Sequence, residues 1–155
     1  ADSAVYAYEY EGYWRDVGTV ESYWKAHMDL LGTQDELQLH DYSWPIFSKT
    51  PNLPPHHILQ GAKVKNAWVN EGCMIFGEVY NSIVAHRCVI EKGAVEDRVI
   101  LTSAFIEHDC YIKYAIIGDE VVIPAHTELI GREDEILLVT HDNLEEILET
   151  QSRGD

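Results

Sequence analysis

The chain has 155 residues, of which 11 are Lys or Arg and 27 are Asp or Glu, giving a formal charge of −16 at pH 7. This length allows one domain, or a small domain with additional segments. The acidic balance argues against nucleic acid, an anionic membrane surface, or a self-contained site for a nucleotide or sugar phosphate, because these need clustered Lys and Arg. No apolar run approaches the roughly 20 residues that span a bilayer, and no basic-then-apolar leader is present, so we expect a cytoplasmic protein.

The N-terminal segment predicts two short strands. Val5 to Tyr10 alternates, with three tyrosines on one face, and aromatic-rich alternation is typical of a strand. Glu11 and Gly12 predict a turn, and Tyr13 to Val17 a second short strand. We therefore expect a strand-turn-strand unit ahead of the first helix.

The first helix is expected to begin after Thr19, a good N-cap, with Glu21 placed favourably for the helix dipole in the first turn. Gly32 is predicted to end the helix at the C′ position. Apolar residues at helical spacing predict one buried stripe, formed by Val20, Trp24, Met28 and Leu31.

Residues 34–57 have no clear period and contain four prolines, which predicts an extended connector. Trp44, Ile46 and Phe47 suggest that the connector is held against a surface. A loop of this length usually marks a domain boundary.

The stretch from Ile58 to Gly131 carries the strongest pattern. A unit of about six residues, three to a turn, is typical of a parallel β-helix, whereas helices and simple strands have other periods. About four coils fit here, and each strand would add one β-branched side chain to a shared core. Val or Ile opens each step: Ile58, Val64, Val69, Ile75, Val79, Val84, Ile90, Val95, Ile100, Ile106, Ile112, Ile117 and Ile123.

Small residues recur four positions after many of these openers, where they would let the backbone turn a tight corner. They are Ala62, Cys73, Cys88, Ala94, Ala104, Cys110 and Thr127. All three cysteines of the chain occupy this position, so we predict that they fill the core as small apolar residues. Their spacing matches no zinc pattern such as C-x-x-C.

The repeat is followed by a polar break at Arg132 to Glu135 and by a predicted strand at Ile136 to Val139. A last helix has two candidate N-caps, Thr140 and Asp142. We expect this extension to cover the end of the β-helix, whose edge would otherwise pair with other chains. The apolar residues of the last helix are Leu144, Ile147 and Leu148.

The densest cluster of candidate functional residues is Tyr13-Trp-Arg-Asp-Val-Gly-Thr19. It places Asp16 between a short strand and a helix N-terminus, a position suited to a metal or a phosphate-bearing ligand. The alternative is that Asp16 is an ordinary turn residue paired with Arg15, and the residues by themselves favour that alternative.

The stretch from Gly12 to Leu31 closely resembles the segment of bacterial glucose-1-phosphate adenylyltransferases (ADP-glucose pyrophosphorylases) that ends their catalytic domain. The YWRDVGT motif within it is specific, whereas many transferases share the hexapeptide repeat. The resemblance covers nearly the whole chain and implies a left-handed β-helix, an exception to the usual right-handed crossover. Further similar segments are Trp44 to Ile46, Leu53 to Pro55, Ala62 to Asn66, Glu71 to Cys73 and Glu135 to Thr140.

The resemblance implies specific roles at the motif. In this family its Asp is one of two carboxylates that hold the catalytic Mg²⁺, so that role is implied for Asp16, and Trp14 is implied to lie near the sugar nucleotide. The implied reaction converts ATP and glucose 1-phosphate into ADP-glucose and pyrophosphate. We find no Gly-rich nucleotide loop, second metal carboxylate or sugar-phosphate lysine, so we expect the C-terminal part of a larger enzyme, inactive alone and assembled as a homotetramer or heterotetramer.

The same resemblance divides the chain into a remnant of the nucleotidyltransferase domain (1–33), an extended linker (34–57), the left-handed β-helix (58–131) and a C-terminal strand and helix (132–155). Relatives activated by fructose 1,6-bisphosphate use arginines near the C-terminus. By position, three of those are Asp119, His141 and Glu145 here. The lost positive charge should weaken a bisphosphate site severely, so we predict no such activation.

Two other functions remain open. Acyltransferases with this repeat use a His as general base, for which His86, His108 and His126 are candidates. Those enzymes are not expected to carry YWRDVGT, and a solvated surface position is the simpler interpretation of each His. The other alternative is a non-catalytic regulatory or scaffold subunit of the same family, although the presence of Asp16 favours the catalytic type.

Overall fold

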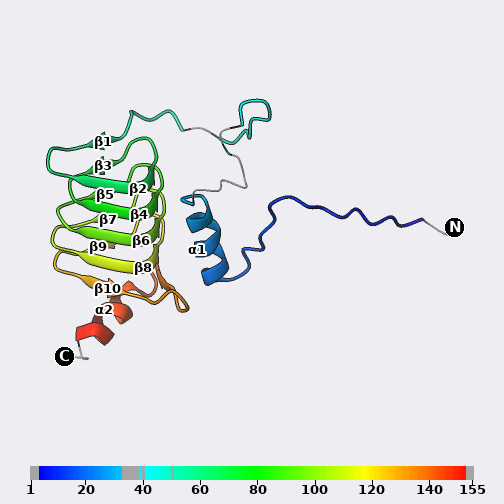
Figure 1. The fold of residues 1–155 in the computed structure, drawn as a ribbon. Coiled ribbons are helices and arrows are strands. Elements are labelled where there is room, and N and C mark those ends of the chain that lie inside the picture. Colours follow the sequence, from blue (N-terminus) through cyan, green and yellow to red (C-terminus); the bar gives the residue numbers. More distant parts are fainter. Residues whose placement is uncertain (1–3, 33–38, 40, 50, 153–155) are drawn as a thin grey trace.

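The computed structural model describes residues 4–32, 39, 41–49 and 51–152. Its central feature is a β-helix of about four coils, whose parallel strands stack in two sheets (Figure 1). One sheet consists of two-residue strands: β1 (His57–Ile58), β3 (Met74–Ile75), β5 (Val89–Ile90), β7 (Phe105–Ile106) and β9 (Val122–Ile123). The other contains β2 (Lys63–Val69), β4 (Glu78–Val84), β6 (Ala94–Ile100), β8 (Tyr111–Ile117) and β10 (Glu128–Ile130).

The aliphatic residues predicted from the repeat form three columns in the core. In the long strands the register aligns Val64, Val79, Val95, Ile112 and Leu129. A second column runs through the ends of the same strands: Val69, Val84, Ile100, Ile117 and Val139. The short strands supply the third: Ile58, Ile75, Ile90, Ile106 and Ile123. From Ile75 onward, no column member is more than 1% exposed, which confirms the predicted β-helix.

The three cysteines are free and buried, with exposed fractions of 1% for Cys73, 0% for Cys88 and 2% for Cys110. Their sulfur atoms lie against backbone carbonyls of the next coil, and Cys110 Sγ donates to the oxygen of Pro124 at 3.2 Å. Burial raises the pKa of the Cys110 thiol, which favours its protonated, unreactive form. The prediction that the cysteines act as small core residues is therefore confirmed.

Each long strand bends at one residue in the left-handed backbone region. These residues are Asn66, Asn81, Asp97 and Tyr114, with φ angles of 49°, 46°, 55° and 49°. Asn and Asp tolerate this region better than most residues do. Their side chains also connect the coils, because Asn66 Nδ2 donates to Asn81 Oδ1 at 2.7 Å and Asn81 Nδ2 to Asp97 Oδ1 at 2.5 Å. The spacing of the aliphatic residues carries no signal for this ladder.

Helix α1 (Val20–Asp29) lies against the outer face of the long-strand sheet (Figure 1). Thr19 is its N-cap as predicted, since Thr19 Oγ1 accepts from the Ser22 amide at 3.1 Å and Ser22 Oγ accepts from the Thr19 amide at 3.0 Å. The predicted stripe is the packing face: Trp24 is 6% exposed and lies in a cluster with Val99, Ile116 and Ile136.

The predicted end of α1 is wrong by one residue. The C-cap is Leu30, in the right-handed region with φ of −66°, so Leu31 rather than Gly32 occupies C′. The amides of Leu30 and Leu31 donate to the carbonyls of His27 and Met28, three residues back. Such tight turns satisfy the last carbonyls without a left-handed glycine.

The two strands predicted before α1 are not formed. Residues 4–17 run as an arm away from the β-helix (Figure 1), and Val5, Tyr6 and Tyr8 are 88–92% exposed. A strand requires a neighbouring strand for its hydrogen bonds, and among the described residues none lies beside this arm. The aromatic alternation of Val5 to Tyr10 therefore has no surface to cover within the described structure.

The prediction that the connector aromatics hold it against a surface is also wrong. Trp44, Ile46 and Phe47 are 82%, 67% and 89% exposed. The connector meets the β-helix further on, where the carbonyl of Pro54 accepts from the amide of Gly72 at 2.7 Å. Residues 33–38, 40 and 50 lie outside the described part of the chain.

The C-terminal extension covers the end of the coil as predicted. Strand β11 (Leu137–Val139) pairs in parallel with β8, and helix α2 (Leu144–Ser152) follows it (Figure 1). Leu144 and Ile147 pack against the core of the β-helix. Among the described residues, no helix has the length and hydrophobicity needed to cross a bilayer.

Of the two candidate N-caps of α2, Thr140 takes part in the hydrogen bonds ahead of the helix, because its carbonyl accepts from the amide of Leu144 at 3.1 Å. Asn143 directly precedes the helix, and its Oδ1 accepts from the amide of Thr140 at 2.8 Å while its Nδ2 donates to the carbonyl of Leu138 at 2.9 Å.

Candidate functional site

The segment leading into α1 carries both site residues that the sequence predicts. Tyr13 Oη donates to Asp29 Oδ2 at 2.9 Å, and Arg15 Nε lies 2.9 Å from the same oxygen. Consecutive side chains of an extended segment point in opposite directions, and Trp14 and Asp16 are accordingly exposed. Tyr13 and Arg15 therefore hold the segment to α1, while Trp14 and Asp16 face solvent together.

Asp16 lies in the irregular segment ahead of the helix, four positions before Val20. Its Oδ1 accepts a hydrogen bond from the amide of Gly18 at 3.1 Å. The predicted alternative pairing with Arg15 is not formed, because Arg15 pairs with Asp29. A Cβ atom at position 18 would lie 3.3 Å from Asp16 Oδ1, so a larger residue there would crowd the carboxylate. The adjacent helix N-terminus favours the negative charge of Asp16.

The carboxylate of Asp16 fits the requirements of one Mg²⁺ ligand. Mg²⁺ prefers oxygen donors and usually binds through one or two carboxylates together with water and phosphate oxygens. Asp16 is exposed and its orientation is set by the Gly18 amide. Within the described part of the chain, no group of three His, Cys, Asp or Glu side chains suited to a metal includes Asp16. The role predicted for this residue stays a prediction.

Trp24 links this segment to the β-helix. Its indole Nε1 donates to the carbonyl oxygen of Asp97 at 3.1 Å. Its ring meets the ring of Tyr114 edge-on, with the centroids 6.0 Å apart. Asp97 and Tyr114 are the left-handed corner residues of β6 and β8. The segment carrying Asp16 is thus anchored through α1 to the corners of two neighbouring coils.

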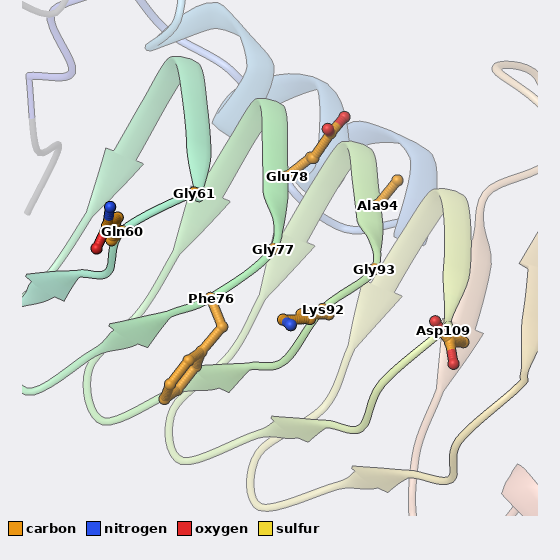
Figure 2. A pocket seen from close by; sticks show the side chains of 9 residues that line it. All are labelled: Gln60, Gly61, Phe76, Gly77, Glu78, Lys92, Gly93, Ala94 and Asp109. Atoms are coloured by element: carbon orange, nitrogen blue, oxygen red, sulfur yellow. The ribbon is translucent and has the colours of Figure 1, made fainter.

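A groove of about 480 Å³ runs along another corner of the coils (Figure 2). It follows the glycines Gly61, Gly77 and Gly93, spaced 16 residues apart (77 − 61 and 93 − 77). A Cβ at Gly77 would lie 2.4 Å from a carbonyl oxygen of the next coil, so the coils approach too closely there for a side chain. The charged residues of the groove are Glu78, Lys92 and Asp109. The regular spacing of these glycines is a sequence signal for the groove.

Of the three histidines considered for acyl transfer, His108 and His126 lie on the surface of the repeat, whereas His86 is partly buried. His86 Nδ1 is 3.3 Å from Glu71 Oε2. The rings of His108 and His126 meet edge-on with centroids 5.0 Å apart, and their side chains are 52% and 72% exposed. The simpler interpretation, a solvated surface position, therefore agrees with the structure for His108 and His126.

Comparisons with known proteins agree with the fold and with the motif. Residues 55–136 match the family described as "GlmU-like, C-terminal hexapeptide". The glucose-1-phosphate adenylyltransferase of Desulforamulus reducens is 44% identical over 124 residues, which are 79% of this chain and 31% of that protein. The proteins of the same name from Bacillus mycoides and Bacillus anthracis are 46% identical over 118 residues, 76% of this chain and 31% of each relative. The chain thus spans about a third of the length of these relatives, and the resemblance stated from the sequence is confirmed.

Proposed function

The chain belongs to the GlmU-like, C-terminal hexapeptide family, and from this membership we propose that it acts as the C-terminal part of a glucose-1-phosphate adenylyltransferase. The observation that carries the proposal is the 44–46% identity to proteins of that name over 76–79% of the chain. The whole enzyme would convert ATP and glucose 1-phosphate into ADP-glucose and pyrophosphate. The YWRDVGT segment ahead of the coil favours this function over acyl transfer.

In the proposed enzyme, Asp16 is one of the carboxylates that hold Mg²⁺. When bound, Mg²⁺ would offset the negative charge that develops on the phosphate oxygens. The Gly18 amide sets the direction of the Asp16 carboxylate, and the pairing of Tyr13 and Arg15 with Asp29 holds the segment in place. Trp14, 77% exposed and two positions before Asp16, would contact the sugar nucleotide.

We further propose that the β-helix is the platform on which the enzyme assembles and is regulated. Large apolar side chains on the arm and connector, such as Tyr6, Tyr8, Trp44 and Phe47, are at least 82% exposed. Large exposed apolar surfaces are typical of contacts with another domain or chain. A homotetramer or heterotetramer in the cytoplasm would cover them, and this chain alone would be inactive.

Pyrophosphate release from ATP and glucose 1-phosphate tests this function. The longest natural polypeptide that contains this chain, and the 155-residue chain itself, would each be assayed with Mg²⁺. We expect release by the former and none by the latter. A folded long polypeptide that releases no pyrophosphate, or one that transfers acyl groups from acyl-coenzyme A instead, would overturn the proposal.

A further inference from the structure

A second group of metal-ligating side chains lies outside the Asp16 segment, on a corner of the last coils. His108 and Asp109 follow β7, and His126 follows β9 on the next coil. The amide of His126 donates to the carbonyl of His108 at 3.1 Å, which aligns the two coils at this point. Nothing in the proposed adenylyl transfer uses these three residues.

The three side chains converge on one point. His108 Nδ1 lies 3.0 Å from Asp109 Oδ2, and His126 Nδ1 lies 3.7 Å from the same oxygen. One ligand atom from each residue lies within 4.8 Å of the other two. Metal–ligand bonds of 2.0–2.1 Å in tetrahedral geometry separate the ligand atoms by about 3.3 Å. The two distances to Asp109 bracket that separation, so small side-chain rotations would suffice to bind an ion.

Backbone and side-chain hydrogen bonds fix the main chain at the three ligand positions. Asp109 and His126 both adopt the left-handed conformation, with φ angles of 57° and 63°. The amide of Asp109 donates to the carbonyl of Lys92 on the preceding coil at 2.5 Å. Glu107 Oε2 accepts from the amide of Ala125 at 2.9 Å, which gives a second link between the two coils that carry the ligands. A site built on such fixed corners loses little entropy when an ion binds.

We propose that His108, Asp109 and His126 form a binding site for a divalent transition metal, with Zn²⁺ as the expected ion. Two imidazoles and one carboxylate are donors that suit Zn²⁺, whereas Mg²⁺ prefers oxygen donors alone. The side chains of the three residues are 52%, 64% and 72% exposed, which leaves a fourth position open to water. The chain's charge of −16 further favours a cation.

The bound ion would connect two successive coils, because Asp109 and His126 belong to different turns of the β-helix. An ion that binds the folded chain more tightly than the unfolded chain stabilises it. Zn²⁺ should therefore raise the melting temperature of the protein. His86 offers an internal comparison, since its Nδ1 lies 3.3 Å from the carboxylate of Glu71 and, among the described residues, it belongs to no group of three candidate metal ligands.

The test is a Zn²⁺ titration of the tag-free 155-residue chain, stripped with a chelator and followed by calorimetry, with Co²⁺ absorption as a second readout of inner-sphere binding. We expect one Zn²⁺ per chain and a rise in melting temperature. His126→Gln should weaken Zn²⁺ binding at least tenfold, the scale of effect seen when a metal site is disturbed, and should abolish the rise. His86→Gln should leave both unchanged.

Equal Zn²⁺ affinity of the wild-type chain and His126→Gln would overturn the site, as would an equal loss in His86→Gln. Asp109→Asn is the second variant, because Asn tolerates the left-handed conformation of position 109 and keeps the fold intact. It should weaken binding at least tenfold as well, and unchanged binding in this variant would also count against the site. MgCl₂ in excess should not displace Zn²⁺, which separates this site from the role proposed for Asp16.

Discussion

The indole Nε1 of Trp24 donates a hydrogen bond to the carbonyl oxygen of Asp97 at 3.1 Å, across 73 positions of sequence. Asp97 is the left-handed corner of β6, and the strand register pairs Glu96 and Arg98 with their neighbours but skips this residue. Trp24 therefore supplies a partner to a carbonyl at the point where the ladder is interrupted. It joins the segment that carries Asp16 to the β-helix.

Two substitutions of Trp24 should lower the free energy of unfolding to different degrees. Trp24→Phe keeps most of the apolar area but leaves the Asp97 carbonyl unpaired, at a cost of about 1–3 kcal/mol. Trp24→Ala also leaves a cavity and should cost about 3–5 kcal/mol. Urea unfolding followed by circular dichroism measures both. The control is Trp14→Phe, whose side chain is 77% exposed and which should change stability by less than about 0.5 kcal/mol. Equal midpoints for wild type and Trp24→Phe would contradict the anchoring role.

Ile106→Asp should unfold the β-helix. Ile106 is 1% exposed in the column of the short strands, so the substitution buries an unpaired carboxylate. We expect Ile106→Asp to lower the free energy of unfolding by more than about 4 kcal/mol. Val122→Asp is the matched control, because Val122 is 48% exposed on the neighbouring short strand. A soluble Ile106→Asp protein that melts with the parent would show that position 106 does not face the core.

Arg98 should be replaceable with a gain in stability. It is 0% exposed, its Nε, Nη1 and Nη2 have no hydrogen-bond partner, and it aligns with the small residues Ser82 and Ala115. Removing a buried, uncompensated charge in favour of an apolar side chain of similar length stabilises proteins by about 1–4 kcal/mol. Arg98→Met should therefore raise the urea midpoint, whereas Arg87→Met, at an exposed position, should not.

The gain from Arg98→Met should depend on pH in a defined direction. Burial holds the pKa of the Arg98 guanidinium well below its ordinary value. Between this lowered pKa and the ordinary arginine pKa, the unfolded chain binds more protons than the folded chain. The destabilisation caused by the buried Arg98 charge is therefore present at neutral pH and falls as pH rises toward the ordinary arginine pKa. The gain measured by urea unfolding should be larger at low pH than at high pH. A gain that grows with pH, or a loss of stability at all pH values, would show that the guanidinium is satisfied.

Fructose 1,6-bisphosphate should not activate the longest natural polypeptide that contains this chain. Asp119, His141 and Glu145 are all exposed, and Asp119 Oδ1 accepts from the amide of Thr102 at 2.9 Å. Two carboxylates at these positions repel a phosphate rather than bind it. The rate of ADP-glucose synthesis with and without the bisphosphate measures this, and a several-fold activation would contradict the prediction.

The core could be predicted from the sequence because its period is regular. The columns through Val79, Val95 and Ile112, and the helical stripe around Trp24, each follow from spacing alone. The two strands before α1 could not be judged in this way. A strand is completed by its neighbour, and the alternation of Val5 to Tyr10 carries no information about whether a neighbour exists.

Features that depend on stacking between coils also leave no signal in the spacing of the aliphatic residues. The strand register places Arg98 beside Ser82, and the spacing of the aliphatic residues carries no signal that this position faces inward. His108 and His126 were each considered singly. Only the register of the coils brings them to the same corner around Asp109.

The metal-ligand role of Asp16 is tested most directly by ADP-glucose synthesis in the longest natural polypeptide that carries Asp16→Asn. Asn retains the size of the side chain and can still accept from the Gly18 amide, so only the charge is lost. The proposed role predicts that the rate falls at least about a hundredfold, because several kcal/mol of transition-state stabilisation are removed. Glu9→Gln, an exposed carboxylate on the same arm, should leave the rate unchanged. Unchanged synthesis by Asp16→Asn would contradict the role.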